Sequence, residues 1–129
     1  MGKPAIGLVR SCGMRWKASA FGSIEIDGVS YERDVILDRG KITWRRKRAS
    51  KVYRDRFGHT PLSLAEDIPW KCKRLVVGSG FEGALPVMPE VLEEAQRRGV
   101  QVVVLPTPKA VERLSRSGGD TNAIVHVTC

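Results

Sequence analysis

The second half of the chain alternates short apolar segments with amphipathic ones, and this order restricts the fold more than any other feature. The apolar segments predict strands and the amphipathic segments predict helices, in turn at 74–77, 89–98, 100–105, 108–117 and 123–129. Glycine follows each predicted helix, as is common at helix ends. A β-α-β-α-β order requires parallel strands joined by right-handed crossovers. We therefore predict an α/β unit with helices on at least one side of its sheet.

The first half favours antiparallel strands instead. Apolar and polar residues alternate over 21–28 and 29–37, and a shorter segment of the same kind follows at 41–44. Asp27-Gly28 and Asp38-Arg39-Gly40 are turn sequences that join these segments. The pattern predicts an antiparallel β-meander that is half exposed.

These segments fit one domain. We predict a three-layer, single-domain α/β fold over residues 1–129, in which the N-terminal antiparallel β-meander joins the β-α-β-α-β unit in a mixed central sheet. Residues 1–14 are expected to be loosely ordered. A short helix is also predicted at 61–68, because Thr60 is suited to cap it and Pro69 to end it.

Composition restricts the compartment and the cofactors. The cysteines are Cys12, Cys72 and Cys129, and an odd count without a C-x-x-C pair argues against a disulfide scaffold or a thiolate zinc site. We therefore expect a cytoplasmic protein with free thiols. Two histidines without clustered carboxylates argue against a metal site, and no apolar run is long enough to span a membrane. No cofactor is predicted.

The strand predicted at 74–77 leads into a loop with the G-x-G-x-x-G spacing of dinucleotide-binding turns. A dinucleotide site needs a helix that opens within the motif, whereas residues 84–88 intervene here. It also needs an acid at the end of the next strand, which ends without one at Thr107. A nucleotide cofactor is therefore not predicted. The loop is either an anion-binding nest or only a tight turn, and its candidate residues are Gly78, Ser79, Gly80 and Gly83.

Most of the positive charge lies in one segment. The net charge is +8, and residues 45–56, the basic stripe, contain seven basic residues against one acid. The basic stripe has three interpretations: a solvated face, a docking site for an acidic protein partner, or a nucleic-acid site in which Trp44 and Tyr53 stack on bases. Its candidate binding residues are Arg45, Arg46, Lys47, Arg48, Lys51 and Arg54.

The two histidines are candidates for a catalytic base. His59 lies in a loop, where it is either a ligand or base, or a neighbour of the helix predicted after it. On the last strand His126 and Thr128 share a face while Cys129 points the other way, which disfavours a nucleophile–base pair of Cys129 and His126. An enzyme that uses His59 or His126, with Ser79 nearby, is the least favoured functional interpretation.

Several short motifs occur in a recognisable order between residues 15 and 129: Phe21-Gly22, Trp44, His59, Gly78-Ser79-Gly80, Leu105-Pro106-Thr107 with Ala110, and His126-Val127-Thr128-Cys129. Together they resemble the Mth938-like family of unknown function. Its eukaryotic members include respiratory complex I assembly factor 3 and the adipogenesis-associated Mth938 domain-containing protein. The chain departs from the family at Arg113-Leu114-Ser115, where other members have an aromatic residue followed by asparagine.

The resemblance implies a three-layer α/β domain, no established enzymatic activity, and a role in assembly or regulation. Taken with the basic stripe, it favours a non-enzymatic binding module that interacts with an unidentified protein partner and holds a small anion at the Gly-Ser-Gly loop. A nucleic-acid-binding protein that uses residues 45–56 is the alternative.

Overall fold

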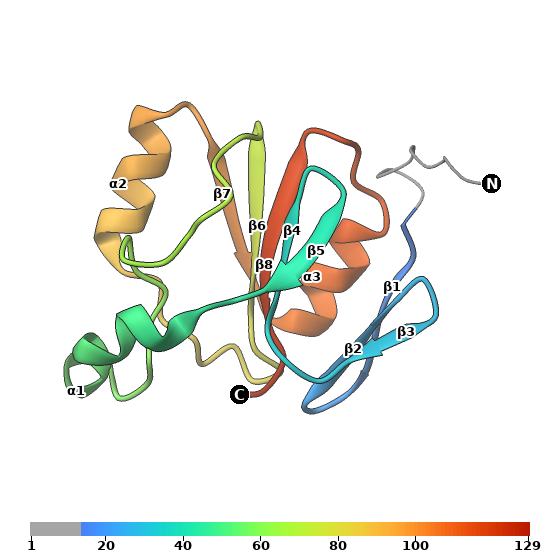
Figure 1. Ribbon diagram of the computed structural model, residues 1–129, viewed down its shortest axis with the longest axis horizontal. Helices are drawn as coiled ribbons and strands as arrows, with labels where there is room; N and C mark the ends of the chain where they lie inside the picture. Colours follow the sequence, from blue (N-terminus) through green and yellow to red (C-terminus); the bar gives the residue numbers. More distant parts are fainter. Residues whose placement is uncertain (1–13) are drawn as a thin grey trace.

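The computed structural model describes residues 14–129, which form two β-sheets (Figure 1). The smaller sheet is antiparallel and consists of β1 (Trp16–Ala20), β2 (Ser23–Ile26) and β3 (Val29–Tyr31). The turn between β2 and β3 is the predicted Asp27-Gly28, whose φ angles of 51° and 84° suit a two-residue hairpin turn. The prediction of loose order at residues 1–14 lies outside the described residues, apart from Met14.

The larger sheet has five strands in the order β5-β4-β8-β6-β7. These strands are β4 (Val35–Asp38), β5 (Lys41–Trp44), β6 (Arg74–Ser79), β7 (Gln101–Leu105) and β8 (Thr121–His126). β6 is parallel to β7 and β8, whereas β4 is antiparallel to β5 and β8. The mixed central sheet is therefore confirmed. The strand predicted over 29–37 is divided, because the chain leaves the small sheet after Tyr31 and enters the large one at Val35.

Both faces of the larger sheet are covered. On one face lie the small sheet and α3 (Thr107–Leu114), and on the other lies α2 (Pro89–Arg97) (Figure 1). Neighbouring residues of β6 project into different cores, as the two-residue repeat of a strand requires. Val76 packs in the core that contains Val111 of α3, and Leu75 and Val77 pack in the core that contains Val91 of α2. These are the three predicted layers.

The segment between β5 and β6 differs from its prediction. It begins with a 3-10 helix, η3 (Lys47–Tyr53), and a single helical turn, α1 (Arg54–Phe57). No helix forms at 61–68, so that prediction is wrong. Leu62 is fully buried and pairs with Val87 in an isolated parallel bridge, and the N–H of Leu62 donates to the Pro86 carbonyl at 2.9 Å. This extended pairing outweighs the local capping signal at Thr60.

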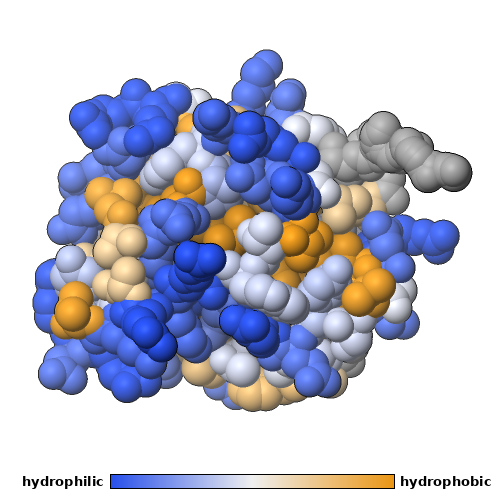
Figure 2. Space-filling model, in the orientation of Figure 1, coloured by the Kyte–Doolittle hydropathy of each residue, from blue (hydrophilic) through white to orange (hydrophobic). Residues whose placement is uncertain are grey.

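The face shown in Figure 2 is mostly hydrophilic, and apolar surface gathers over β5 near its centre. A groove there includes Ile36, Ile42 and Trp44 in its lining. Within residues 14–129, no helix is long and apolar enough to cross a membrane. The described cysteines, Cys72 and Cys129, are free thiols.

Candidate functional site

Strand pairing brings distant segments together at one end of the larger sheet. β4 pairs with β8 so that Val35 lies opposite Val125, and β4 pairs on its other side with β5. Both pairings are antiparallel, so Asp34 lies beside His126 on one side and beside Arg45 on the other. The N–H of Arg45 also donates to the Asp34 carbonyl at 3.0 Å. The break between β3 and β4 therefore places a carboxylate at the centre of the site.

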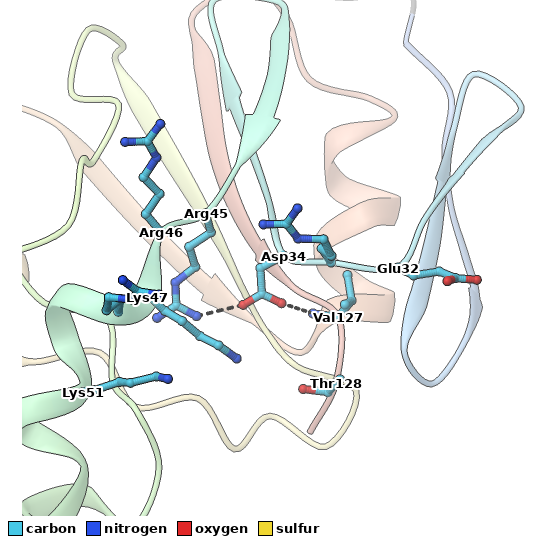
Figure 3. A pocket seen from close by; sticks show the side chains of 10 residues that line it. Glu32, Asp34, Arg45, Arg46, Lys47, Lys51, Val127 and Thr128 are labelled. Carbon is cyan, nitrogen blue, oxygen red and sulfur yellow. Dashed lines mark hydrogen bonds and ion pairs between the residues drawn. The ribbon is translucent and has the colours of Figure 1, made fainter.

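Arg45 is buried between two carboxylates. Its Nη1 donates to Asp34 Oδ2 at 2.9 Å (Figure 3), and its Nε and Nη2 donate to the two Glu66 oxygens at 2.8 and 3.0 Å. The Arg45 side chain is 0% exposed. The prediction that Arg45 is a partner-binding residue of the basic stripe is therefore corrected, because its charge is already neutralised inside the fold.

Asp34 and Arg45 are both charged at neutral pH. Burial alone would raise the pKa of Asp34, but the hydrogen bond and charge of His126, the N–H of Val127 and the charge of Arg45 lower that pKa from 3.8 to about 2. Burial likewise opposes the charge of Arg45, and the hydrogen bonds and charges of Glu66 and Asp34 outweigh it and raise the Arg45 pKa. His126 contributes most to lowering the pKa of Asp34, Glu66 contributes most to raising the pKa of Arg45, and the attraction between Asp34 and Arg45 adds to both.

Two serines complete this network and attach η3 to it. The hydroxyl of Ser50, in η3, donates to Glu66 Oε2 at 2.6 Å and lies 2.6 Å from the hydroxyl of Ser63. Ser50 is the buried residue of η3, and its neighbours on the helix are exposed. The network therefore holds η3 with its basic side chains directed outward.

A cleft of about 560 Å³ lies between η3 and the end of β8 (Figure 3). Its lining residues are Glu32, Arg33, Asp34, Arg45, Arg46, Lys47, Arg48, Lys51, Val127 and Thr128. Arg46, Lys47, Arg48 and Lys51 are exposed, and none of these four forms an ion pair with any residue from 14 to 129. We refer to this cleft of about 560 Å³ as the basic cleft. It unites five of the six basic residues that the sequence singled out, and four of these five are exposed.

A second cavity, of about 180 Å³, adjoins the basic cleft, because Lys47 and Thr128 line both. Arg54, the remaining predicted residue of the basic stripe, lines this smaller pocket. Cys129 Sγ lies 3.9 Å from His59 Nδ1 in its wall. No pattern in the sequence predicts the contact between Cys129 and His59, because tertiary packing alone positions the loop that carries His59.

His126 connects the buried network to the smaller pocket. Its Nδ1 lies 2.8 Å from Asp34 Oδ2, and its Nε2 lies 3.1 Å from Thr128 Oγ1. The prediction that the side chains of His126 and Thr128 share a face is thus confirmed. His126 is buried, whereas Thr128 is half-buried at the boundary of the two cavities.

The glycine loop after β6 is occupied by the chain itself. The N–H groups of Glu82 and Ala84 donate to the main-chain oxygen of Cys129 at 3.1 and 3.0 Å, and the N–H of Gly83 closes the turn onto the Gly80 carbonyl at 3.0 Å. Donors that an anion-binding nest would use are therefore already bonded. The structure favours the interpretation of this loop as a tight turn.

Close packing explains why this loop contains glycine. Gly80 has a φ of 100°, and a Cβ there would overlap the main-chain carbon of Cys129. At Gly78, a Cβ would lie 3.1 Å from Thr107 Oγ1. Ser79 is buried and donates its hydroxyl to a β7 carbonyl at 3.1 Å. Ser79 pairs with His126 in the register of β6 and β8, but its hydroxyl is bonded to β7 and it lines neither the basic cleft nor the smaller pocket, so it is not placed as a nucleophile.

Residues 16–115 match the family described as a protein of unknown function (DUF498/DUF598), which accounts for more than half of the chain. The chain belongs to this family. As a DUF498/DUF598 protein it shares a fold with several solved structures. It is 27% identical to the conserved hypothetical protein PH1505 from Pyrococcus horikoshii OT3, with a TM-score of 0.70 over 90% of this chain and 100% of the other.

Two further structures carry the Mth938 name. The chain is 27% identical to MT938, with a TM-score of 0.65 over 90% of this chain and 99% of that one. It is 17% identical to a Mth938-like domain protein from Bordetella pertussis, with a TM-score of 0.56 over 98% of this chain and 92% of that one. The resemblance to the Mth938-like family is therefore confirmed, and the function of the family is unknown.

In this DUF498/DUF598 chain, the motifs that carry the resemblance meet around the last residues. The N–H of Gly22 donates to the Val127 carbonyl at 2.7 Å, and the Thr107 hydroxyl donates to the His126 carbonyl at 2.5 Å. The N–H of Gly80 donates in turn to Thr107 Oγ1 at 2.9 Å. Motifs that are scattered along the sequence thus form one contact region that positions the end of β8.

Proposed function

We propose that this chain is a binding module that docks an acidic segment of a partner protein in the basic cleft. The separation of the basic stripe into two groups supports this proposal. Arg45 is buried and neutralised, whereas Arg46, Lys47, Arg48 and Lys51 are exposed around one cavity. A face that only keeps a protein soluble does not need its charges to line a cavity. Such docking is what an assembly or regulatory role requires.

The buried network prepares the cleft for binding. Ser50 is bonded to Glu66, and Glu66 to Arg45, so the backbone of η3 is held in place before a partner arrives. A pre-ordered surface loses less conformational entropy on binding than a flexible one. The exposed cations then contribute mainly to the rate of association and to the choice of an acidic partner.

Nucleic acid is the weaker candidate because the aromatic residues expected to stack on bases already have partners. The Arg33 guanidinium lies over the Trp44 ring at 4.7 Å from its centroid, and the Tyr31 ring packs against Trp44 with centroids 5.8 Å apart. Tyr53 packs against the core beneath α2. A base could stack only on the part of Trp44 that these contacts leave exposed, which is 44% of the residue. The glycine loop has no part in the proposal, since its N–H groups are bonded within the chain.

The experiment compares two variants that lose equal charge. The cleft variant carries Arg46→Gln, Lys47→Gln, Arg48→Gln and Lys51→Gln. The control variant carries the same change at four exposed positions outside the cleft: Lys71, Lys73, Lys109 and Arg116. Each protein is titrated with a fluorescent poly-glutamate peptide and, separately, with a fluorescent oligothymidylate, and binding is followed by anisotropy.

We expect the cleft variant to lose at least about tenfold in affinity for poly-glutamate and the control variant to stay within about twofold. Equal losses in both variants would contradict the proposal, because they would show binding to net charge alone. If wild type binds oligothymidylate more tightly than poly-glutamate, and only the cleft variant loses that binding, the ligand of the basic cleft is nucleic acid and not an acidic protein.

A further inference from the structure

Three side chains at the end of β8 form a hydrogen-bonded relay. Asp34 Oδ2 lies 2.8 Å from His126 Nδ1, and His126 Nε2 lies 3.1 Å from Thr128 Oγ1. This is the order of acid, imidazole and hydroxyl that activates a hydroxyl nucleophile in acyl transfer. We propose that Thr128 is the nucleophile of an ester-hydrolysing site, with His126 as its general base and Asp34 as the residue that positions His126.

The backbone fixes the relay. The N–H of Val127 donates to the other Asp34 oxygen, Oδ1, at 3.0 Å (Figure 3), so the carboxylate is held by the same strand that carries the ring. His126 and Thr128 are two residues apart on extended chain and therefore project to the same side. The side chains of Asp34 and His126 are each 9% exposed, whereas Thr128 lines both cavities. Thr128 is half-buried and is thus the most accessible member of the relay.

The charges set the direction of proton transfer. Asp34 is ionised at neutral pH and only accepts hydrogen bonds, so from the hydrogen-bond network we assign the ring proton that faces it to His126 Nδ1. The lone pair on Nε2 then accepts the proton of the Thr128 hydroxyl. An ionised carboxylate behind the imidazole serves to hold this tautomer and this orientation.

The smaller pocket restricts the substrate. Its volume of about 180 Å³ is below the roughly 300–1,000 Å³ of pockets for drug-sized ligands, so it accommodates a short acyl group. Lys47 and Arg54 line it together with Thr128. A cation beside the ester carbonyl stabilises the negative charge that develops on the carbonyl oxygen. The same cations favour a negatively charged leaving group, so the substrate class is a short-chain ester of an anionic alcohol or phenol.

The reaction balances with water as the only co-reactant. Thr128 Oγ1 bonds to the ester carbonyl carbon while its proton moves to His126 Nε2. The bond from that carbon to the leaving oxygen then breaks, and the leaving oxygen takes the proton from Nε2. Water attacks the acyl-Thr128 ester with Nε2 as base, and Thr128 leaves with its hydroxyl restored. The products are a carboxylic acid and the alcohol or phenol.

A second nucleophile borders the same pocket and has to be separated from Thr128 in the experiment. Cys129 is the adjacent residue, and its thiol contacts His59. The ester-hydrolysing site does not depend on the proposed docking of an acidic protein, because no partner takes part in the reaction. Failure of one proposal therefore leaves the other intact.

The test uses the full chain with 4-acetoxybenzoate and with its neutral methyl ester. The variants are Thr128→Val, which removes the hydroxyl at nearly constant shape, Thr128→Ser, which keeps it, and Cys129→Ser. We expect wild type, Thr128→Ser and Cys129→Ser to hydrolyse both esters. Thr128→Val should fall at least about a hundredfold in kcat/KM with its fold retained by circular dichroism. Mass spectrometry of the quenched reaction should find the acetyl group on Thr128.

Two results would overturn the proposal: equal hydrolysis by wild type and Thr128→Val, or acetylation of Cys129 or lysine in place of Thr128. The substrate class is tested by the ratio of the enzymatic rate to the background rate of each ester. This ratio should be higher for 4-acetoxybenzoate than for its methyl ester. A higher ratio for the methyl ester would overturn the assignment of an anionic leaving group. Asp34→Asn should lower kcat and leave KM unchanged, because Asp34 does not line the smaller pocket. An unchanged kcat would refute the positioning role of Asp34.

Discussion

The guanidinium of Arg45 and the carboxylate of Asp34 form a buried ion pair, with Nη1 2.9 Å from Oδ2. The two residues meet because β4 and β5 are antiparallel neighbours. Through Glu66, Arg45 anchors η3 and the wall of the basic cleft, and Asp34 holds His126 at the end of β8. One ion pair therefore connects the proposed docking surface with the relay beneath it.

Arg45→Met should strongly destabilise the fold. The substitution leaves Asp34 and Glu66 buried without a counter-charge, and breaking a buried pair in this way costs about 3–5 kcal/mol of the free energy of unfolding. Arg46→Met, on the exposed neighbour, should change that free energy by less than about 0.5 kcal/mol. Denaturant unfolding measures both. A loss below about 1 kcal/mol for Arg45→Met would show that the pair does not hold the site together.

Asp34 should also make stability depend on pH, through its contacts with His126, Val127 and Arg45. The pKa of Asp34 is lowered in the fold from 3.8 to about 2, so the folded state binds this proton less readily than the unfolded state. Its contribution is complete above the unfolded pKa and is lost as pH falls through the folded pKa, which amounts to about 2 kcal/mol between pH 5 and pH 2. Asp34→Asn removes the titrating group. The gap in unfolding free energy between wild type and Asp34→Asn should therefore shrink over that range, and a constant gap would contradict the lowered pKa.

Gly80→Ala should cost more than backbone strain alone. A Cβ at Gly80 meets the main chain of Cys129, whereas a Cβ at Gly22, which also has a positive φ of 93°, meets nothing within 4 Å. Gly22→Ala should cost on the order of 1–2 kcal/mol from strain, and Gly80→Ala clearly more, because overpacking adds to the strain. Gly118→Ala is the unstrained control, with open space around its Cβ. Thermal unfolding ranks the three, and equal costs for Gly80→Ala and Gly22→Ala would mean that the last residues do not pack on this loop.

Binding of poly-glutamate should weaken as salt rises. The cations of the basic cleft are exposed, and the Debye length falls from about 30 Å at 0.01 M salt to about 8 Å at 0.15 M. We expect a loss of at least about tenfold in affinity for wild type over this range and a smaller loss for the cleft variant. An affinity that does not change with salt would indicate an apolar contact, for which the groove at Trp44 is the nearest candidate.

Periodicity predicted the fold where local and tertiary preferences agree. The helix predicted at 89–98 is α2 (Pro89–Arg97), because its proline start and apolar face suit both the isolated segment and the core. At 61–68 the local preference for a helix and the tertiary packing disagree. Burial of Leu62 and its pairing with Val87 hold the segment extended. No local sequence pattern predicts a bridge to a residue so distant in the chain.

The candidate site was only partly visible in the sequence. The charge of the basic stripe is a local property, so its exposed residues were found. Arg45 lies in the same basic segment as the exposed residues, so the sequence does not distinguish it from them, although it is buried. Its partners Asp34 and Glu66 are single acids outside any motif. The shared face of His126 and Thr128 followed from the two-residue repeat of a strand. The carboxylate behind them carries no local signal, because the alternating pattern over 29–37 predicts one uninterrupted strand through Asp34.

Mapping of backbone amide chemical shifts by NMR during a titration with poly-glutamate tests the central claim most directly. Docking in the basic cleft predicts that the largest changes occur in η3, at residues 47–53, and at Thr128 on the opposite wall. Changes of equal size at Lys71, Lys73 and Lys109, or changes that spare η3, would contradict it.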